Sequence, residues 1–145
     1  MRRVVIDTNV VIKGFFVPGS KHARIVEQVA RGGVRLFYSL GMIEELIEVA
    51  NYPKVKKYFK IHSEDLFEAA VRIRKRGTIV KPEETNLCRD VKDNMVLGTA
   101  MAAAKFGHTF LVTEDEDLSA LVGKVEKVKI VQPGEFLKEH AGSGK

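Results

Sequence analysis

Two short apolar runs, each followed at once by acidic residues, constrain this chain more than any other feature of its sequence. Residues 4–6 read Val-Val-Ile and lead directly into Asp7, and residues 109–112 lead into the acidic segment 113–117. Short runs of this kind are typical of strands that are buried on both faces, as in parallel sheets. The sequence therefore predicts a buried sheet with carboxylates where two of its strands end.

Helices are predicted between these strands. Apolar residues recur at helical spacing in several segments, and strands that alternate with helices form parallel βαβ units. We therefore expect an α/β fold, a three-layer sandwich with a central, mostly parallel sheet of Rossmann-like type. The strands are expected at residues 4–6, 34–38, 78–80, 109–112 and 128–131, and the helices from about residue 10 and at 20–31, 42–50, 55–59, 63–76, 90–106, 118–122 and 135–140.

The length and composition fit one domain. The 145 residues are 45% hydrophobic and 30% charged, which is ordinary for a globular protein. We expect residues 1–140 to form the domain and residues 141–145 to be a frayed tail. The single cysteine, Cys88, excludes an internal disulfide and a zinc site built from cysteines. No apolar run reaches the roughly 18 residues of a membrane-spanning helix, so we expect no membrane contact and a cytoplasmic location.

The charge of the chain favours a polyanionic partner. Its net charge is +5 and its pI is near 9.4. The densest basic segment holds four lysines around two aromatic residues: Lys54, Lys56, Lys57 and Lys60, with Tyr58 and Phe59. This segment could follow a nucleic-acid backbone and stack on its bases. A solvated helix face with core aromatic residues explains it equally well.

The acids after the first and fourth predicted strands should meet, because open parallel sheets place their sites beyond the carboxyl ends of the strands. Asp7 also fits the role of a helix cap. Asp93 shares a helical row with Leu97 and Ala100, so its carboxylate is predicted to point inward. Asp90 fits a cap at the start of the same helix instead.

Two further positions stay open. On a helical wheel Glu45 borders the apolar arc of the helix at residues 42–50, and Glu44 lies only slightly farther round. In the segment 113–117, a run of acids repels itself unless a positive charge lies between its members. Converging carboxylates need cations, and Mg²⁺ and Mn²⁺ prefer oxygen ligands that they share with substrate phosphate. An acidic pocket on a basic protein therefore indicates phosphodiester chemistry.

A more specific resemblance lies in four blocks of sequence. They read Val-Val-Ile-Asp-Thr-Asn-Val at residues 4–10, Ile-Glu-Glu-Leu at 43–46, Cys-Arg-Asp-Val-Lys-Asp-Asn at 88–94 and Val-Thr-Glu-Asp-Glu-Asp-Leu at 112–118. In order and spacing, with an acid in each, these blocks resemble the PIN-domain family. They resemble most the branch of proposed toxins from toxin-antitoxin pairs.

This resemblance implies a PIN-like fold and a ribonuclease that hydrolyses phosphodiester bonds of single-stranded RNA with Mg²⁺ or Mn²⁺. It also implies an antitoxin protein as a partner, and a homodimer is a further expectation. The catalytic, metal-binding acids that it implies are Asp7, Glu45, Asp93 and Asp115, with Asp117 as a further metal ligand. The polar support positions that it matches are Thr8, Asn9 and Thr113. Asp115 and Asp117 both remain candidates for the fourth ligand.

Other protein classes fit less well. A phosphatase of the haloacid-dehalogenase type needs a second aspartate two residues after the first, and Asn9 stands there. A dinucleotide-binding domain needs a G-x-G-x-x-G motif, which the chain lacks. The alternative that remains is a non-catalytic nucleic-acid-binding or scaffold module on the same fold. Such a module usually loses the acids, whereas this chain has an acid in every block.

Overall fold

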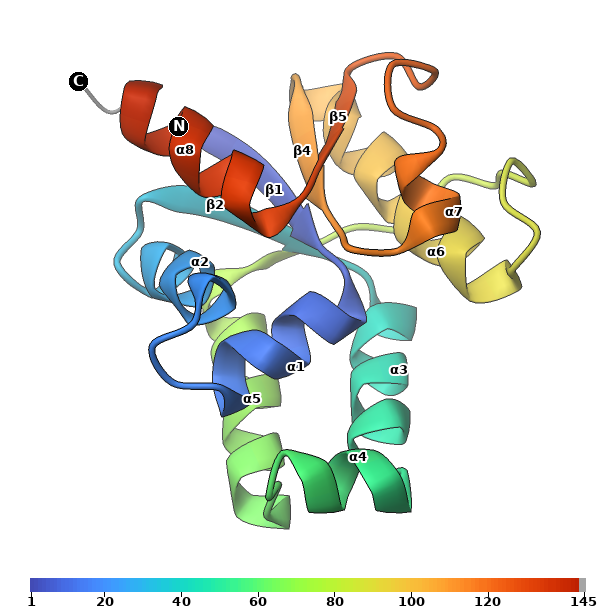
Figure 1. Ribbon diagram of the computed structural model, residues 1–145. Coiled ribbons are helices and arrows are strands. Elements are labelled where there is room, and N and C mark those ends of the chain that lie inside the picture. Colours follow the sequence, from blue (N-terminus) through green and yellow to red (C-terminus); the bar gives the residue numbers. More distant parts are fainter. Residues whose placement is uncertain (144–145) are drawn as a thin grey trace.

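The computed structural model describes the backbone of residues 1–143 and the side chains of residues 1–139. Five parallel strands form one sheet in the order β3-β2-β1-β4-β5 (Figure 1). β1 is the central strand, and its neighbour β4 comes much later in the chain. Residues that are distant in sequence therefore lie together at the carboxyl edge of the sheet. The strands are β1 (Arg2–Ile6), β2 (Val34–Tyr38), β3 (Thr78–Ile79), β4 (Thr109–Val112) and β5 (Val128–Val131).

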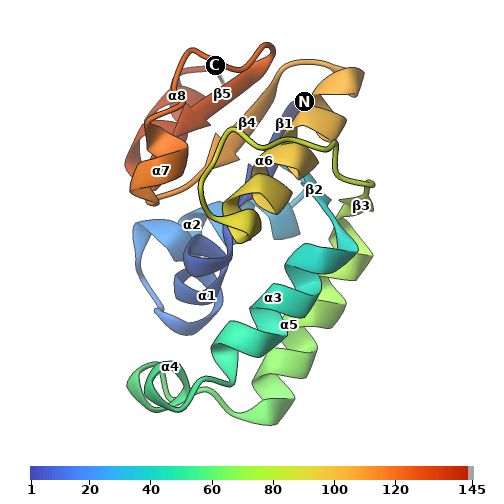
Figure 2. The ribbon, with the colours of Figure 1, turned by 90° about the vertical axis from the view of Figure 1, so that its right-hand side faces the viewer.

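Helices cover both faces of the sheet, so the predicted three-layer α/β sandwich is confirmed (Figure 2). Successive side chains of a strand point to opposite faces. Val4 and Ile6 accordingly pack with α1, α2, α3, α5 and α8, and Val5 packs with α6 and α7. The helices are α1 (Thr8–Phe16), α2 (Lys21–Ala30), α3 (Leu40–Ala50), α4 (Pro53–Tyr58), α5 (Ser63–Arg76), α6 (Val91–Ala103) with the 3-10 turn η1 (Ala104–Phe106), α7 (Glu116–Ser119) and α8 (Pro133–Ser143).

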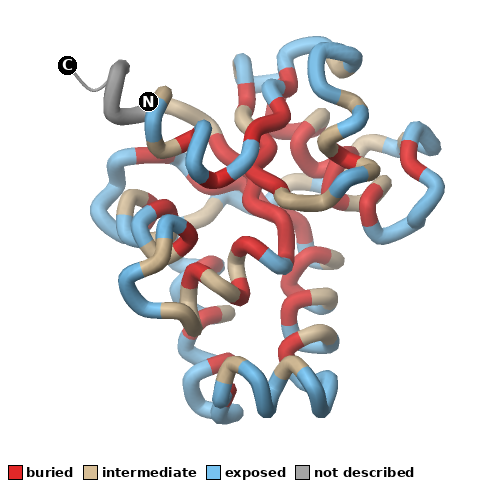
Figure 3. Tube along the Cα trace, viewed as in Figure 1, coloured by how far each residue is buried: buried red, intermediate tan, exposed pale blue. Residues whose placement is uncertain are grey.

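The α3, α4 and α5 helices form an arm that extends away from the sheet (Figure 1). The trace of β1 is largely buried, whereas most of α4 at the end of the arm is exposed (Figure 3). A proline begins α4, at a position where its missing N–H is not needed by the helix. The helix predicted at residues 55–59 therefore begins two residues earlier, at Pro53.

Several helix boundaries differ from the predictions. The first helix begins at Thr8 because Asp7 caps it. The helix predicted at residues 118–122 begins two residues earlier, at Glu116, because Asp115 caps it. The last helix reaches Ser143 and so overlaps the tail predicted at residues 141–145, whose final two residues lie outside the described part of the chain.

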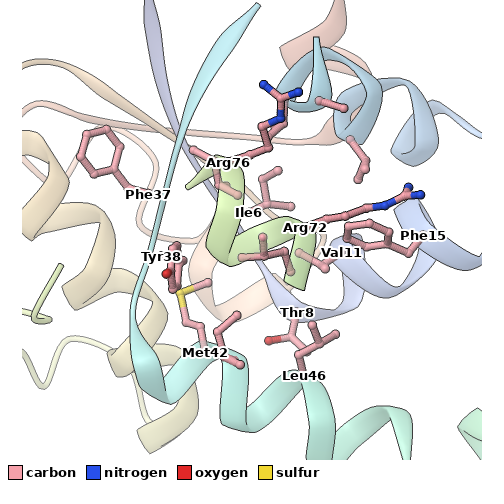
Figure 4. Close-up of a pocket in the computed structure, with 16 residues that line it drawn as sticks. Ile6, Thr8, Val11, Phe15, Phe37, Tyr38, Met42, Leu46, Arg72 and Arg76 are labelled. Atoms are coloured by element: carbon pink, nitrogen blue, oxygen red, sulfur yellow. The ribbon is translucent and has the colours of Figure 1, made fainter. Parts of the chain in front are cut away.

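A small apolar cavity of about 70 Å³ lies between the sheet and α1, α2, α3 and α5 (Figure 4). Its walls include Ile6, Val11 and Leu46. Thr8 lines the cavity, and the guanidinium-bearing side chains Arg72 and Arg76 border it. Packing is therefore less complete beneath Thr8 than in the centre of the sheet, where Val4 and Val5 are fully buried.

Candidate active site

Asp7 follows the central strand and serves two structural purposes. It is the N-cap of α1, and its Oδ1 accepts a hydrogen bond of 2.8 Å from the backbone N–H of Thr8. Its Oδ2 accepts a second hydrogen bond of 2.7 Å from the Thr113 hydroxyl. Burial raises the pKa of Asp7, these two hydrogen bonds lower it, and the charges of Asp115 and Glu114 raise it; the net shift is upward. Both carboxylate oxygens are thus fixed in direction.

Thr113 and Asp115 form the turn after β4. The Thr113 side chain is fully buried, and its Oγ1 also accepts a hydrogen bond of 3.0 Å from the backbone N–H of Asp115. Asp115 is the N-cap of α7, and its Oδ1 accepts a hydrogen bond of 3.0 Å from the backbone N–H of Leu118. Thr113 therefore bonds to both acids at this edge: to the side chain of Asp7, which follows β1, and to the backbone of Asp115, which follows β4.

Asp93 lies in the first turn of α6 and is buried, with 8% of its surface exposed. The inward orientation that its helical row predicted is therefore found. Asp90 caps the helix through a 2.9 Å hydrogen bond from Lys92 N–H, also as predicted. Asn94 fixes the loop before the helix, because its side chain bonds both the N–H and the carbonyl of Cys88, at 2.8 and 2.9 Å. The sequence analysis gave Asn94 no role.

Three of the predicted acids come together closely enough to hold one cation. Asp93, Asp115 and Asp117 each offer an atom within 4.8 Å of the others. Burial is the largest cause that raises the pKa of Asp93 to about 7, and the charges of Asp115 and Asp7 contribute to the same rise. Asp7 is not a member of this close group, but it lies near enough to act on Asp93 electrostatically. The alternatives Asp115 and Asp117 are thus both present in the group.

Glu45 reaches the same edge from the middle of α3. Its Oε2 accepts a hydrogen bond of 2.9 Å from the Thr8 hydroxyl. Burial raises the pKa of Glu45, the bond from Thr8 lowers it, and the charge of Asp7 raises it, with a net upward shift. Glu44 is exposed. Of the two neighbouring glutamates, only Glu45 therefore faces Thr8 and Asp7.

The donor set fits a hard divalent cation. The close group consists of carboxylate oxygens, which Mg²⁺ and Mn²⁺ prefer. Cys88 lies nearby, but burial and then the charge of Asp93 raise the pKa of its thiol, so no thiolate competes for the ion. Burial is the largest cause of the raised pKa values of Asp7, Glu45 and Asp93, and neighbouring carboxylates also raise them. A cation at this edge would favour the ionised form of these acids.

One acid of the β4–α7 turn has two basic partners, which were not predicted from the sequence. Glu114 Oε1 lies 3.0 Å from Lys13 Nζ and 3.0 Å from His22 Nε2. Burial raises the pKa of Glu114, but the bonds from Lys13 and His22 lower it, and the net shift is downward. Lys13 and His22 are roughly a hundred residues away in sequence, and no local pattern links them to Glu114.

Asn9 and the basic segment are the remaining predicted site residues, and neither is part of the close group of acids. Asn9 is exposed in the first turn of α1 and makes no hydrogen bond to the acids among the described side chains. Asp117 pairs at 3.3 Å with Arg89. The four lysines of the basic segment are exposed on the arm, in α4 and just after it: Lys54, Lys56, Lys57 and Lys60. They lie at the far end of α3 from the sheet (Figure 1).

These observations define a class of protein, a parallel α/β sandwich that presents a carboxylate site for a divalent cation at the carboxyl edge of its sheet. The sequence model of the PIN domain matches residues 3–117. The chain belongs to the PIN domain family, which is generally a metal-dependent nuclease fold.

One known protein is similar to this chain in sequence, and another is similar to it in fold. The chain is 25% identical over 145 residues to the uncharacterized protein MJ1680 of Methanocaldococcus jannaschii, covering 94% of this chain and 90% of that protein. It is similar in fold to the PIN domain of T. brucei RRP44, with a TM-score of 0.53 at 11% identity over 99% of this chain and 83% of that one. Within the described residues, no helix is long and apolar enough to cross a membrane.

Proposed function

We propose that this protein is an endoribonuclease that hydrolyses phosphodiester bonds of single-stranded RNA and depends on Mg²⁺ or Mn²⁺. The observation that carries the proposal is the close group of Asp93, Asp115 and Asp117, in which Asp93 has a pKa near 7. Carboxylates this close are costly unless a cation is shared among them. We assign residues 1–140 to the nuclease domain.

We assign roles from the positions of the residues and from the family pattern. Asp7, Asp93 and Asp115 would hold the metal, with Asp117 as a further ligand. Glu45 would orient the attacking water or help to hold a second ion, and Thr8 holds Glu45 in place through its 2.9 Å hydrogen bond. When bound, Mg²⁺ or Mn²⁺ supplies a water of lowered pKa and stabilises the leaving oxygen. Thr113 fixes Asp7 and the Asp115 backbone together, and Asn9 remains a support residue by family pattern alone.

The substrate class rests on charge and on exposed aromatic surface. A net charge of +5 favours a polyanion. We propose that RNA runs along the arm, where the exposed Lys54, Lys56, Lys57 and Lys60 neutralise phosphates and Tyr58, 79% exposed, stacks on a base. Phe59 is partly buried against the core and shapes the segment rather than contacting RNA.

A role as the toxin of a toxin-antitoxin pair is the finer part of the proposal. It is supported by the order of the four acidic blocks, and it implies an antitoxin protein as partner and the cytoplasm as the compartment. A short reading frame beside the gene, whose product binds this protein and suppresses its activity, is the expected finding. A homodimer is tested by light scattering. The alternative function, a non-catalytic binding module, is disfavoured because buried acids such as Asp93 would then be kept without a use.

The direct test uses purified protein and a labelled single-stranded RNA. Cleavage is expected with Mg²⁺ or Mn²⁺ and is expected to stop when EDTA is added. Asp93→Asn should lower turnover by several orders of magnitude, because it removes both a ligand and a charge. Asp90→Asn is the matched control, since asparagine caps a helix as well as aspartate does. Undiminished cleavage by Asp93→Asn would refute the site assignment.

A further inference from the structure

An ion cluster of one acid and two basic side chains is centred on Glu114, in the β4–α7 turn. Glu114 Oε1 accepts hydrogen bonds of 3.0 Å from Lys13 Nζ and from His22 Nε2. Lys13 comes from the last turn of α1, and His22 from the first turn of α2. The side chain of His22 is 10% exposed and that of Glu114 is 29% exposed, so the cluster is partly shielded from water. Glu114 thus ties the turn to two helices.

The turn that Glu114 anchors also carries two residues of the candidate site. Its neighbour on one side, Thr113, donates to Asp7, and its neighbour on the other side, Asp115, belongs to the close group. Each of these three consecutive side chains is engaged with a different element. The orientation of Thr113 and Asp115 therefore depends on how firmly the residue between them is held.

We infer that Glu114 is a positioning residue, which holds the β4–α7 turn against α1 and α2 and so sets the place of Asp115 in the metal site. The inference rests on the proposed metal site and adds a role for three residues outside it. Glu114 does not bind the cation in this scheme, because both of its close partners are bases. Lys13 and His22 act through Glu114 alone.

Positioning and simple electrostatics predict opposite results for one substitution. Removing a positive charge near a cation site should tighten cation binding if only long-range charge matters. If Lys13 instead helps Glu114 to hold the turn, its removal should weaken binding. Lys13→Met retains the aliphatic stem and removes the ammonium group. The sign of the change in Mn²⁺ affinity therefore separates the two explanations.

The experiment measures Mn²⁺ binding to metal-free protein by calorimetry, without RNA. Glu114→Ala is expected to weaken binding by about tenfold, the lower end of what outer-shell partners of metal ligands contribute. Glu114→Gln should restore most of the affinity, because its amide oxygen can accept both hydrogen bonds. A metal ligand would instead lose binding in both variants. Lys13→Met should weaken binding, and Glu116→Ala, which changes an exposed acid of the same segment, should leave it unchanged.

A second measurement does not depend on metal. Amide hydrogen exchange of Asp115 and Leu118 in the metal-free protein should speed up in Glu114→Ala and in Lys13→Met, because the turn opens more often. The inference is overturned if Lys13→Met binds Mn²⁺ as tightly as the wild type or more tightly, or if exchange is unchanged in both variants. Absence of RNA cleavage by the wild-type protein would overturn the proposed function instead, so the two failures are distinguishable.

Discussion

The hydroxyl of Thr113 donates a buried 2.7 Å hydrogen bond to Oδ2 of Asp7, and this bond joins residues 106 positions apart. It follows from the register of the sheet, in which Ile6 lies opposite Val112, so that the next residue of each strand meets its counterpart. One hydroxyl thereby orients the acid after β1 and, through the N–H of Asp115, the acid after β4. The fold and the site are coupled at this bond.

Thr113→Val should separate the effect of the hydroxyl on stability and metal binding from the effect of the side chain's shape. Valine fills nearly the same space, but Oδ2 of Asp7 and the N–H of Asp115 both lose their buried partner. We expect a loss of about 1–3 kcal/mol in the free energy of unfolding, measured with urea, together with weaker Mn²⁺ binding. Thr113→Ser keeps the hydroxyl and should remain close to wild type in Mn²⁺ binding. Equal losses in both variants would show that the methyl group matters more than the hydrogen bond.

The metal-free protein should lose stability as the pH rises towards neutrality. The pKa of Asp93 is raised from 3.8 to about 7 in the folded protein, so the folded state binds a proton that the unfolded state has released. The stabilising effect of this proton is complete below pH 4 and is lost as the pH rises through 7. Thermal melts of the wild type and of Asp93→Asn are compared across this pH range. The melting temperature of the variant should depend less on pH, and at pH 8 it should be higher than that of the wild type. Asp90→Asn removes only a smaller cause of this shift, so it should reduce the pH dependence much less than Asp93→Asn does.

The lysines of the arm are tested by the salt dependence of RNA binding. Reversing the charge of Lys56 and Lys57 should weaken binding and flatten its slope against salt concentration, because fewer counterions are released. Filter-binding titrations across a salt series measure both quantities. Reversal of Lys124 and Lys138, which are exposed elsewhere, is the matched control. An unchanged slope after the first substitution would assign the arm lysines to a solvated face.

The products should distinguish between two chemistries that cut RNA. Ribonucleases that use the 2′-hydroxyl as nucleophile generally need histidines as acid and base, and here the buried His22 is bonded to Glu114. A carboxylate site suits attack by water, which leaves a 5′-phosphate and a 3′-hydroxyl. End-group analysis of the fragments tests this. A substrate with one deoxynucleotide at the cut position should still be cleaved, and cyclic phosphate ends with complete resistance at that position would contradict the mechanism.

Gly98 should be required for the loop that covers α6. A Cβ atom at this position would lie 2.2 Å from the carbonyl oxygen of Glu83, whose N–H donates to the Gly98 carbonyl at 2.9 Å. Gly98→Ala should therefore lower the melting temperature, although alanine favours helices over glycine. In Gly134→Ala the new Cβ would meet nothing within 4 Å, so that control should not be destabilised. Equal melting temperatures for the two variants would show that the loop can move aside.

Local patterns were enough to predict the sheet edge but not the contacts across it. The apolar runs at residues 4–6 and 109–112 marked the buried strands, and parallel pairing then placed Asp7 and Asp115 at one edge. The inward orientation of Asp93 could be predicted because Asp93 shares a helical row with apolar residues, and this spacing is visible in the sequence. The choice between Glu44 and Glu45 needed the position of Thr8, which depends on how α3 packs against α1.

The ion cluster at Glu114 shows what sequence patterns cannot reveal. Its partners Lys13 and His22 come from two other helices, and each looks like an ordinary polar residue in its own segment. Pairing of this kind is decided by tertiary packing, with no periodicity to mark it. The same holds for Asn94, whose two hydrogen bonds to Cys88 depend on the path of the loop before α6.

The strand order also has a consequence for the time at which the candidate site can form during synthesis. Chains are made from the N-terminus, and Asp7 belongs to the first strand, but β1 lies against β4, which is made much later. Until Thr113 and Asp115 have left the ribosome, Asp7 lacks its hydrogen-bond donor and Asp93 lacks its neighbouring carboxylates. A partly made chain therefore has no complete acid group, and the candidate site can form only after the chain has been made as far as Asp117.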